Sequence, residues 1–405
     1  MINRLGPLRL PLPLSCGVPI LPMQTAQITA RPQPSKFYPE RLLIKEPAHW
    51  SIDRIRVGNR AGALVQDLPG MLFAPDAQGR FPGCGEIEIP PGGKLIIEVT
   101  YIGTREAGIP FEACVFGSDD PPPPTVMSNA LRDGERKIAT ARSASPIRVA
   151  HSARLSTDPM DREAWPCRLV IKDASSWVVH DVLVGGISIF AQSGDVPGVM
   201  FSKDVATEVC LGHLAAGDKF SVDATYVGAA SDAEFVYELY GTHAESEAAD
   251  LPSAAILPMS TGIPILPTQS AQITACCQLP DGLRRGVDPR QGFVAERIVV
   301  EGAADWVFNN IRIGRSMQFA QSGDVPGLAF SPRTLGGQVS FDVARALIDV
   351  AIVTTHVGTH EGGAPFYCGI LGSLVDLTEV APSLQRGRIL STRDLYGATA
   401  RKVNA

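Results

Sequence analysis

Histidine and acidic side chains at short spacing are the residues of this chain that could do chemistry most directly. His356 and His360 lie four positions apart, and Glu361 follows the second of them. On a helix, this spacing would place both imidazole rings on one face and provide half of a zinc site. The neighbouring residues instead predict that His356 ends a strand. We therefore interpret its ring as packed in the core and not as a metal ligand.

Two carboxylates occupy the same position in a repeated turn. Asp195 and Asp324 both stand in the sequence Ser-Gly-Asp-Val-Pro-Gly. Asp initiates such turns with its own side chain, and Pro-Gly suits the two central positions of a type II turn. A calcium ion would need several further oxygen ligands, whereas the turn supplies one carboxylate. We predict a structural role for both residues.

The other reactive residues form no catalytic or metal-binding signature. The eight cysteines show neither zinc-site spacing nor pairs that recur along the chain, which favours reduced thiols and folding in a cytoplasm. The sequence contains no GxSxG, no HExxH and no phosphate-binding glycine loop. We therefore predict that the protein is not an enzyme, with no catalytic, cofactor-binding or metal-binding residues and no cofactor.

One nine-residue pattern occurs three times, beginning at Trp50, Trp177 and Trp306. Apolar residues stand at offsets 0, 2, 5 and 7 from the tryptophan, which is the two-residue period of a strand interrupted by one extra residue. The pattern predicts a strand with a β-bulge and argues against a helix. The polar pair at offsets 3 and 4 differs chemically between copies, so we assign it to the bulge and not to a shared reaction. These pairs are Asp53-Arg54, His180-Asp181 and Asn309-Asn310.

Further landmarks recur around each tryptophan and divide the chain into three modules. We predict module 1 at residues 25–118, module 2 at 147–242 and module 3 at 263–373. Linkers are expected at 119–146 and 243–262, and a tail at 374–405. Residues 1–24 are predicted to be a Pro-rich arm, extended along a sheet edge or a neighbouring subunit. A weak signal segment is the alternative interpretation of these residues.

Each module is expected to be an antiparallel β-sandwich of seven or eight short strands. No amphipathic helical pattern separates the strands, so parallel βαβ units are excluded. The Cys-Trp-Cys spacing of immunoglobulin domains is missing, which favours a jelly roll. The fold class is therefore all-β, with three tandem sandwiches and a tryptophan between the two sheets of each.

Composition and charge exclude two classes of partner. The formal net charge is −6, so neither a general nucleic-acid surface nor sequence-specific nucleic-acid binding is expected. No run of about 18 apolar residues exists, so we predict no membrane-spanning helix.

The repeated sandwiches with Pro-rich ends are similar in organisation to tandem jelly-roll virion proteins, which form phage capsids or decorate them. This resemblance implies that the sandwiches tile a shell and that the arms tie neighbouring subunits together. On this basis we expect a homo-oligomeric structural protein of a virus or bacteriophage. Its partners would be copies of itself and other particle proteins, and its location the virion, assembled in the host cytoplasm.

Two other classes of function stay open. A multi-domain carbohydrate- or surface-binding protein of the adhesin type would expose aromatic side chains on its loops or on one sheet face. An enzyme on a sandwich scaffold, such as a cupin, would need a repeated set of histidine and glutamate ligands. The seven histidines of this chain do not repeat with the modules.

Overall fold

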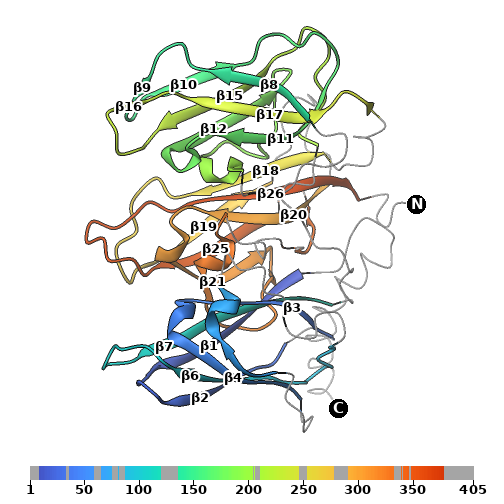
Figure 1. Ribbon diagram of the computed structural model, residues 1–405. Coiled ribbons are helices and arrows are strands. Elements are labelled where there is room, and N and C mark those ends of the chain that lie inside the picture. The colour runs from blue at the N-terminus through green and yellow to red at the C-terminus, as the bar shows by residue number, and fades with distance from the viewer. Residues whose placement is uncertain are drawn as a thin grey trace, which may run out of the picture.

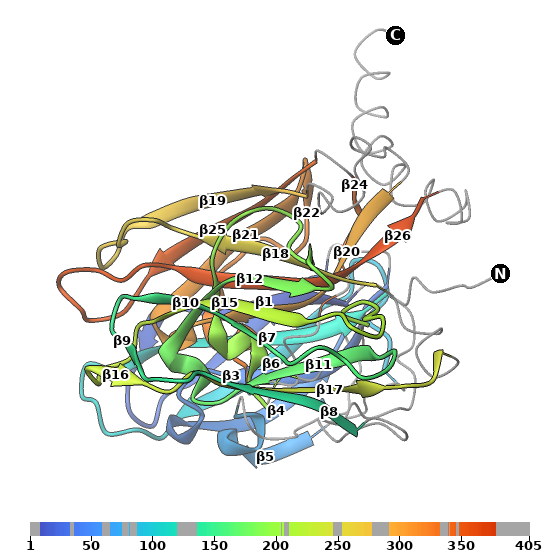
Figure 2. The same cartoon turned by 90° about the horizontal axis from the view of Figure 1, so that it is seen from above.

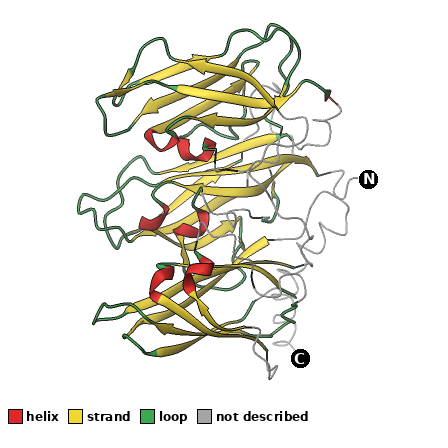
Figure 3. Ribbon diagram, viewed as in Figure 1, coloured by secondary structure: helices red, strands yellow, loops and turns green. Residues whose placement is uncertain are grey.

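The computed structural model describes residues 9–32, 36–58, 65–74, 81, 87–119, 136–203, 205, 210–245, 253–277, 291–332, 339, 341–345 and 348–377 (Figure 1). Antiparallel strands and short 3-10 helices make up the regular structure of these residues (Figure 3). The all-β fold class expected from the sequence is confirmed.

Module 1 is a sandwich of two antiparallel sheets. Its first sheet has the strand order β1-β7-β3, and its second sheet has the order β2-β6-β4-β5. Strands β1 to β4 alternate between the sheets and the last strand pairs with the first, which is jelly-roll connectivity. The strands are β1 (Arg9–Ile20), β2 (Thr25–Ala30), β3 (Tyr38–Ile44), β4 (Trp50–Val57), β5 (Val65–Pro69), β6 (Leu95–Tyr101) and β7 (Ile109–Ser118). The 3-10 helices are η1 (Pro47–His49) and η2 (Gly70–Phe73).

Module 2 repeats this arrangement, with sheets β11-β17-β8 and β10-β15-β12-β13 and with β14 also paired to β12. Its strands are β8 (Arg136–Arg142), β9 (Ile147–Arg148), β10 (Ser152–Ser156), β11 (Trp165–Ile171), β12 (Trp177–Val184), β13 (Ile187–Ser188), β14 (Val196–Pro197), β15 (Phe220–Tyr226), β16 (Asp232–Ala233) and β17 (Val236–Thr242). The helices η3 (Ala174–Ser176) and η4 (Gly198–Phe201) correspond to η1 and η2.

Module 3 has the sheets β18-β26-β20-β24 and β19-β25-β21-β22, with β23 paired to β21. Its strands are β18 (Ala254–Ser260), β19 (Ser270–Cys276), β20 (Gln291–Val300), β21 (Trp306–Ile313), β22 (Ser316–Met317), β23 (Val325–Pro326), β24 (Ala344–Arg345), β25 (Asp349–His356) and β26 (Tyr367–Asp376). The helices are η5 (Ala303–Asp305) and η6 (Gly327–Phe330).

A β-bulge interrupts the tryptophan-led strand of every module, as predicted. The pairing of β4 with β6, of β12 with β15 and of β21 with β25 skips one residue, which is Asp53, His180 or Asn309. The extra residue lets the strand keep its apolar side chains on the inner face on both sides of the bulge.

The three tryptophans lie at equivalent places between the two sheets of their modules. Trp50, Trp177 and Trp306 are at most 2% exposed. Two rings flank each of them, one from the end of the strand that pairs with the tryptophan-led strand, and one at or just before the start of the last strand of the module. These pairs are Tyr101 with Phe111, Tyr226 with Phe235, and His356 with Phe366.

The predicted boundaries of the modules need correction. Strand β1 lies within the predicted arm at 1–24 and pairs with β7 at the edge of the first sheet. Strands β8 and β18 lie within the predicted linkers at 119–146 and 243–262, and each occupies the same place in its own module. Strand β1 is extended along a sheet edge, as predicted for residues 1–24, but it belongs to module 1. Prolines made β1 and β18 resemble linkers although Leu10, Leu12 and Leu14 alternate, and β8 has only one large apolar residue, Ile138. The rest of the predicted tail, from residue 378, and residues 120–135 and 246–252 of the predicted linkers lie outside the described residues.

The modules are stacked in the spatial order 2, 3, 1, so that module 3 lies between the other two (Figure 1). The long strands of all three run across the stack in roughly the same direction (Figure 2). One continuous apolar core joins modules 1 and 3, and the core of module 2 includes Ile256, Val299 and Leu371 of module 3. The stack is therefore a single packed body.

Candidate functional site

A hydrogen-bonded row of three side chains in module 2 has the geometry of a catalytic triad. Nδ1 of His180 lies 2.6 Å from a carboxylate oxygen of Asp195, and its Nε2 lies 2.6 Å from the hydroxyl oxygen of Thr225. The bulge in β12 directs the imidazole along the sheet surface toward β15, and the turn before β14 supplies the carboxylate. A histidine held in this way could take the proton of a nucleophilic hydroxyl.

The other modules make equivalent contacts with other side chains. In module 3, Asn309 replaces the histidine, donates to Asp324 at 2.9 Å and accepts from the hydroxyl of Thr355 at 2.7 Å. In module 1, Asp53 accepts directly from Thr100 at 2.6 Å. An amide cannot act as a general base, yet it makes the same two contacts. The row therefore fastens the bulge to the neighbouring strand and to the following turn.

The charge on His180 nevertheless depends on this contact. The hydrogen bond to Asp195 raises the pKa of His180, desolvation opposes the shift, and the negative charges of Asp195 and Asp223 add to it. Module 2 thus contains a titratable group at a position where module 3 has a neutral amide.

The structure separates the two histidines that raised the question of a metal site. His356 is 1% exposed and its ring packs on Trp306, with 4.9 Å between ring centroids. His360 is exposed in the following loop. Among the described residues, no group of three or more His, Cys, Asp or Glu side chains could hold a metal ion.

The Pro-Gly pair after Asp195 and Asp324 does not form the predicted type II turn. Gly198 and Gly327 begin 3-10 helices and do not adopt the positive φ that such a turn requires. They are glycines because the chain passes close to the tryptophan-led strand. A Cβ on either residue would lie 2.7 Å from the carbonyl oxygen of Trp177 or Trp306, and the equivalent Gly70 makes the same approach to Trp50.

The residues before these glycines hold module 2 against module 3. We call residues 191–198 and the equivalent residues 320–327 the docking turns. In the first of them, the N–H of Ala191 donates to the carbonyl oxygen of Ile256 at 2.6 Å. The side chain of Gln192 donates to the carbonyl oxygen of Pro258 at 3.4 Å and accepts from the N–H of Cys276 at 2.9 Å.

The second docking turn makes the same contacts between module 3 and module 1. The N–H of Ala320 donates to the carbonyl oxygen of Pro11 at 2.9 Å. The side chain of Gln321 donates to the carbonyl oxygen of Pro13 at 2.8 Å and accepts from the N–H of Arg31 at 2.8 Å. Each glutamine thus pairs with two main-chain groups, one within the first strand of the neighbouring module and one at or just after the end of its second strand.

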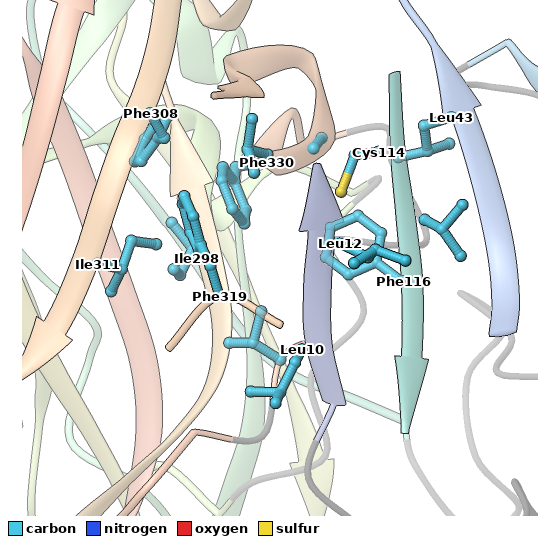
Figure 4. Packing of buried hydrophobic residues seen from close by; sticks show 14 of the residues in the cluster. Leu10, Leu12, Leu43, Cys114, Phe116, Ile298, Phe308, Ile311, Phe319 and Phe330 are labelled. Carbon is cyan, nitrogen blue, oxygen red and sulfur yellow. The ribbon is translucent and has the colours of Figure 1, made fainter. Parts of the chain in front are cut away.

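Apolar packing accompanies these hydrogen bonds. Phe330 of η6 packs edge-on against Phe116 of β7, with 6.2 Å between ring centroids (Figure 4). In the other interface, Met200 of η4 lies against Gly369 of β26, where a Cβ would overlap its sulfur. The interface is therefore built twice from the same parts: the docking turn and 3-10 helix of one module, and the outer face of the first sheet of the next.

The sequence predicted these turns but not their role. Modules 2 and 3 both contain Phe-Ala-Gln-Ser-Gly-Asp-Val-Pro-Gly, whereas module 1 lacks the glutamine at this place. The glutamine is repeated in the two modules that make the contact and is absent from the third. This difference was the signal that the sequence offered.

The loops that follow β6, β15 and β25 lie along one side of the stack (Figure 1). Each of these loops carries an exposed aliphatic side chain. Ile102, Val227 and Val357 are 49%, 47% and 41% exposed and hold equivalent positions after β6, β15 and β25. The loops that precede β2, β10 and β19 add further ones. We call the whole set the loop row: Val18, Leu21, Met23, Ile102, Val149, Val227, Ile263, Leu266 and Val357.

Comparison with known proteins adds no relative. The chain matches no protein-family model and no curated protein. Among solved structures, it aligns with the arabinofuranosyltransferase AftD from Mycobacteria at 10% identity and a TM-score of 0.15. The alignment covers 84% of this chain and 38% of that chain. A TM-score this low carries no argument. No helix among the described residues is both long and apolar enough to cross a membrane.

Proposed function

We propose that the protein is a non-enzymatic structural subunit of a large particle, as a capsid or decoration component of a virus or bacteriophage. The observation that carries this proposal is the loop row. Exposed apolar residues that gather on one side of a molecule can mark a contact surface. Here the same kind of side chain is exposed at equivalent loop tips in three modules, and on the same side.

The stack makes these loop tips act together. The docking turns fix the three modules relative to one another, so the loop tips are presented at fixed spacing. Contacts that are individually weak become strong when one rigid body makes them together. Once the first contact has formed, the second and third form at a high effective concentration. A subunit of a shell or of its decoration needs a surface of this kind.

The test replaces one loop-row residue in each module, as Ile102→Asp, Val227→Asp and Val357→Asp in one chain. The backbone N–H groups of these residues donate to His49, Ser176 and Asp305, and a change of side chain leaves these bonds in place. We expect wild-type protein to form large particles in sedimentation velocity and electron microscopy, and the triple variant to form none.

A matched control carries the same charges elsewhere. Ile187, Met317 and Ile348 are 52%, 43% and 39% exposed and lie outside the loop row. Their replacement by Asp should leave particle formation unchanged. Wild-type protein that stays monomeric at every concentration would contradict the proposal, as would equal losses in both triple variants.

A surface-binding protein is the second candidate, because loops at one end of a sandwich are also a common place for ligand binding. Carbohydrate recognition would favour exposed aromatic rings, whereas the strongly exposed large apolar residues of the described chain are all aliphatic. Binding of the monomer to a glycan array without particle formation would support this candidate.

A further inference from the structure

The surface of module 1 that corresponds to the docking interface is apolar and uncovered. Met71 and Leu72 of η2 are 54% and 48% exposed, Pro69 is exposed, and Leu68 is partly exposed. We call these four residues the vacant docking surface.

The equivalent residues of the other modules are covered by a neighbour. In module 2, Val196 and Met200 are at most 2% exposed and lie against Gly369 of module 3. In module 3, Val325 and Ala329 are at most 1% exposed, and the adjacent Phe330 packs against Phe116 of module 1. These residues are thus buried where a neighbouring module covers them and exposed in module 1, where none does.

The complementary half of the interface is uncovered on module 2. In modules 1 and 3 the outer face of the first sheet receives a docking turn, and Leu43 and Val299 on it are at most 2% exposed. The equivalent Val170 of module 2 is partly exposed. Beside it lie Glu238 and Lys137, joined by an ion pair of 2.9 Å. We call this surface the free sheet face.

We propose that a second copy of the chain occupies the vacant docking surface with its free sheet face, so that copies associate head to tail. This contact would continue the stack with the apolar part of an interface that the chain already uses twice, without the glutamine that module 1 lacks. One chain holds both unfilled halves, so a single kind of contact satisfies both. Head-to-tail contacts produce a closed ring when their rotation closes and an open series when it does not.

The composition of the two surfaces fits a contact between separate chains. The internal interfaces join parts of one chain, and they combine apolar packing with the hydrogen bonds of Gln192 or Gln321. The free sheet face keeps an ion pair and a partly exposed tyrosine, Tyr240, whose hydroxyl donates to Glu238. Interfaces that form between separately soluble partners are generally more polar than permanent ones. This inference deepens the proposed role of a particle subunit, on which it rests, by naming one contact between copies.

The test uses two full-length variants, one for each half of the interface. Leu72→Arg places a charge on the vacant docking surface, and Val170→Arg places one on the free sheet face beside Glu238. Both are made in the Ile102→Asp, Val227→Asp, Val357→Asp background, where contacts of the loop row are removed. Thermal unfolding confirms that each variant is folded, and sedimentation velocity measures association.

We expect the background protein to associate, and each Arg variant to weaken association about 100-fold, because a long charged side chain must lose its water and does not fit a closely packed contact. Mixing the two variants should restore a species of two chains that grows no further. In that pair, the intact docking surface of one chain meets the intact sheet face of the other. If two vacant docking surfaces instead paired around a two-fold axis, the free sheet face would take no part. Val170→Arg would then associate as strongly as the background protein.

Normal association of Val170→Arg, or an unassociated background protein, would overturn the inference. These outcomes are distinct from failure of the proposed function. Loss of the head-to-tail contact with particles still formed by wild-type chains refutes the inference alone. Head-to-tail association without particles refutes the proposed function alone.

Discussion

The side chain of Gln321 donates a hydrogen bond of 2.8 Å to the carbonyl oxygen of Pro13, across 308 residues of sequence. This contact joins module 3 to the first strand of module 1, and Gln192 joins module 2 to module 3 in the same way. Because each glutamine also accepts from a main-chain N–H, its loss would leave two main-chain groups without their partner.

Replacing Gln321 by Ala should therefore lower the free energy of unfolding by about 1–3 kcal/mol. We expect module 1 to unfold at a lower temperature than the rest, which would split the calorimetric transition. Gln269, an exposed residue of the β18–β19 loop, is the control, and Gln269→Ala should leave a single transition at the wild-type temperature. An unchanged melting curve for Gln321→Ala would show that the docking turn does not hold the modules together.

Gly327→Ala tests the close approach of η6 to β21. The added Cβ would lie 2.7 Å from the carbonyl oxygen of Trp306, so the helix must move away from the strand. We expect a loss of about 2–4 kcal/mol in unfolding free energy, measured by chemical denaturation. Gly262 is the control, because nothing lies within 4 Å of the place that its Cβ would take, and Gly262→Ala should cost less than about 1 kcal/mol.

His180→Asn tests whether the row with Asp195 and Thr225 is structural. The substitution installs in module 2 the amide that module 3 already carries at Asn309. We expect the stability to change by less than about 1 kcal/mol in denaturant unfolding. Fluorophosphonate and acylating probes should not label Thr225 in the wild-type protein. Labelling of Thr225 that disappears in His180→Asn would instead identify an activated nucleophile.

Glu301 should make the stability depend on pH. Burial raises the pKa of Glu301 from 4.5 to about 7, so the folded chain binds this proton more tightly than the unfolded chain. Its stabilising effect is fully present below pH 4.5 and is lost as the pH rises to about 7. The raised pKa of His180 acts with the same sign, above its ordinary value of 6.5.

We expect wild-type protein to lose about 2 kcal/mol relative to Glu301→Gln between pH 4.5 and 7, after allowance for partial solvent screening. Denaturant unfolding of both proteins at several pH values measures this difference. Parallel stability profiles for the two proteins would show that Glu301 does not titrate in this range.

Features that depend on the local spacing of apolar residues could be predicted from the sequence. The bulges at Asp53, His180 and Asn309 follow from an apolar period of two that slips by one residue, and burial of the tryptophans follows from the same pattern. Edge strands were missed because Pro13 and Pro258 remove backbone donors that an inner strand would need, and their segments resemble linkers. The docking turns were found as turns only, since neither period nor propensity indicates which surfaces of separate modules meet.

The candidate triad could not be foreseen for a related reason. His180 and Thr225 come together through strand pairing, and Asp195 joins them through the path of a turn. The spacing of these three residues in the sequence does not indicate that their side chains contact one another. We infer a structural role because the other two modules place different side chains at the same positions.

The central claim is that one docking turn, used twice, places module 3 between modules 2 and 1. It is tested most directly by the double variant Pro13→Cys, Gly323→Cys, since a Cβ on Gly323 would lie 3.2 Å from the Cβ of Pro13. A disulfide needs about 3.5–4.5 Å between these atoms, so the turn must shift slightly, and the positive φ of Gly323 adds strain to the cysteine. Peptide mapping after mild oxidation should find residues 13 and 323 joined within one chain. Absence of that bond, or its formation only between chains, would contradict the stack.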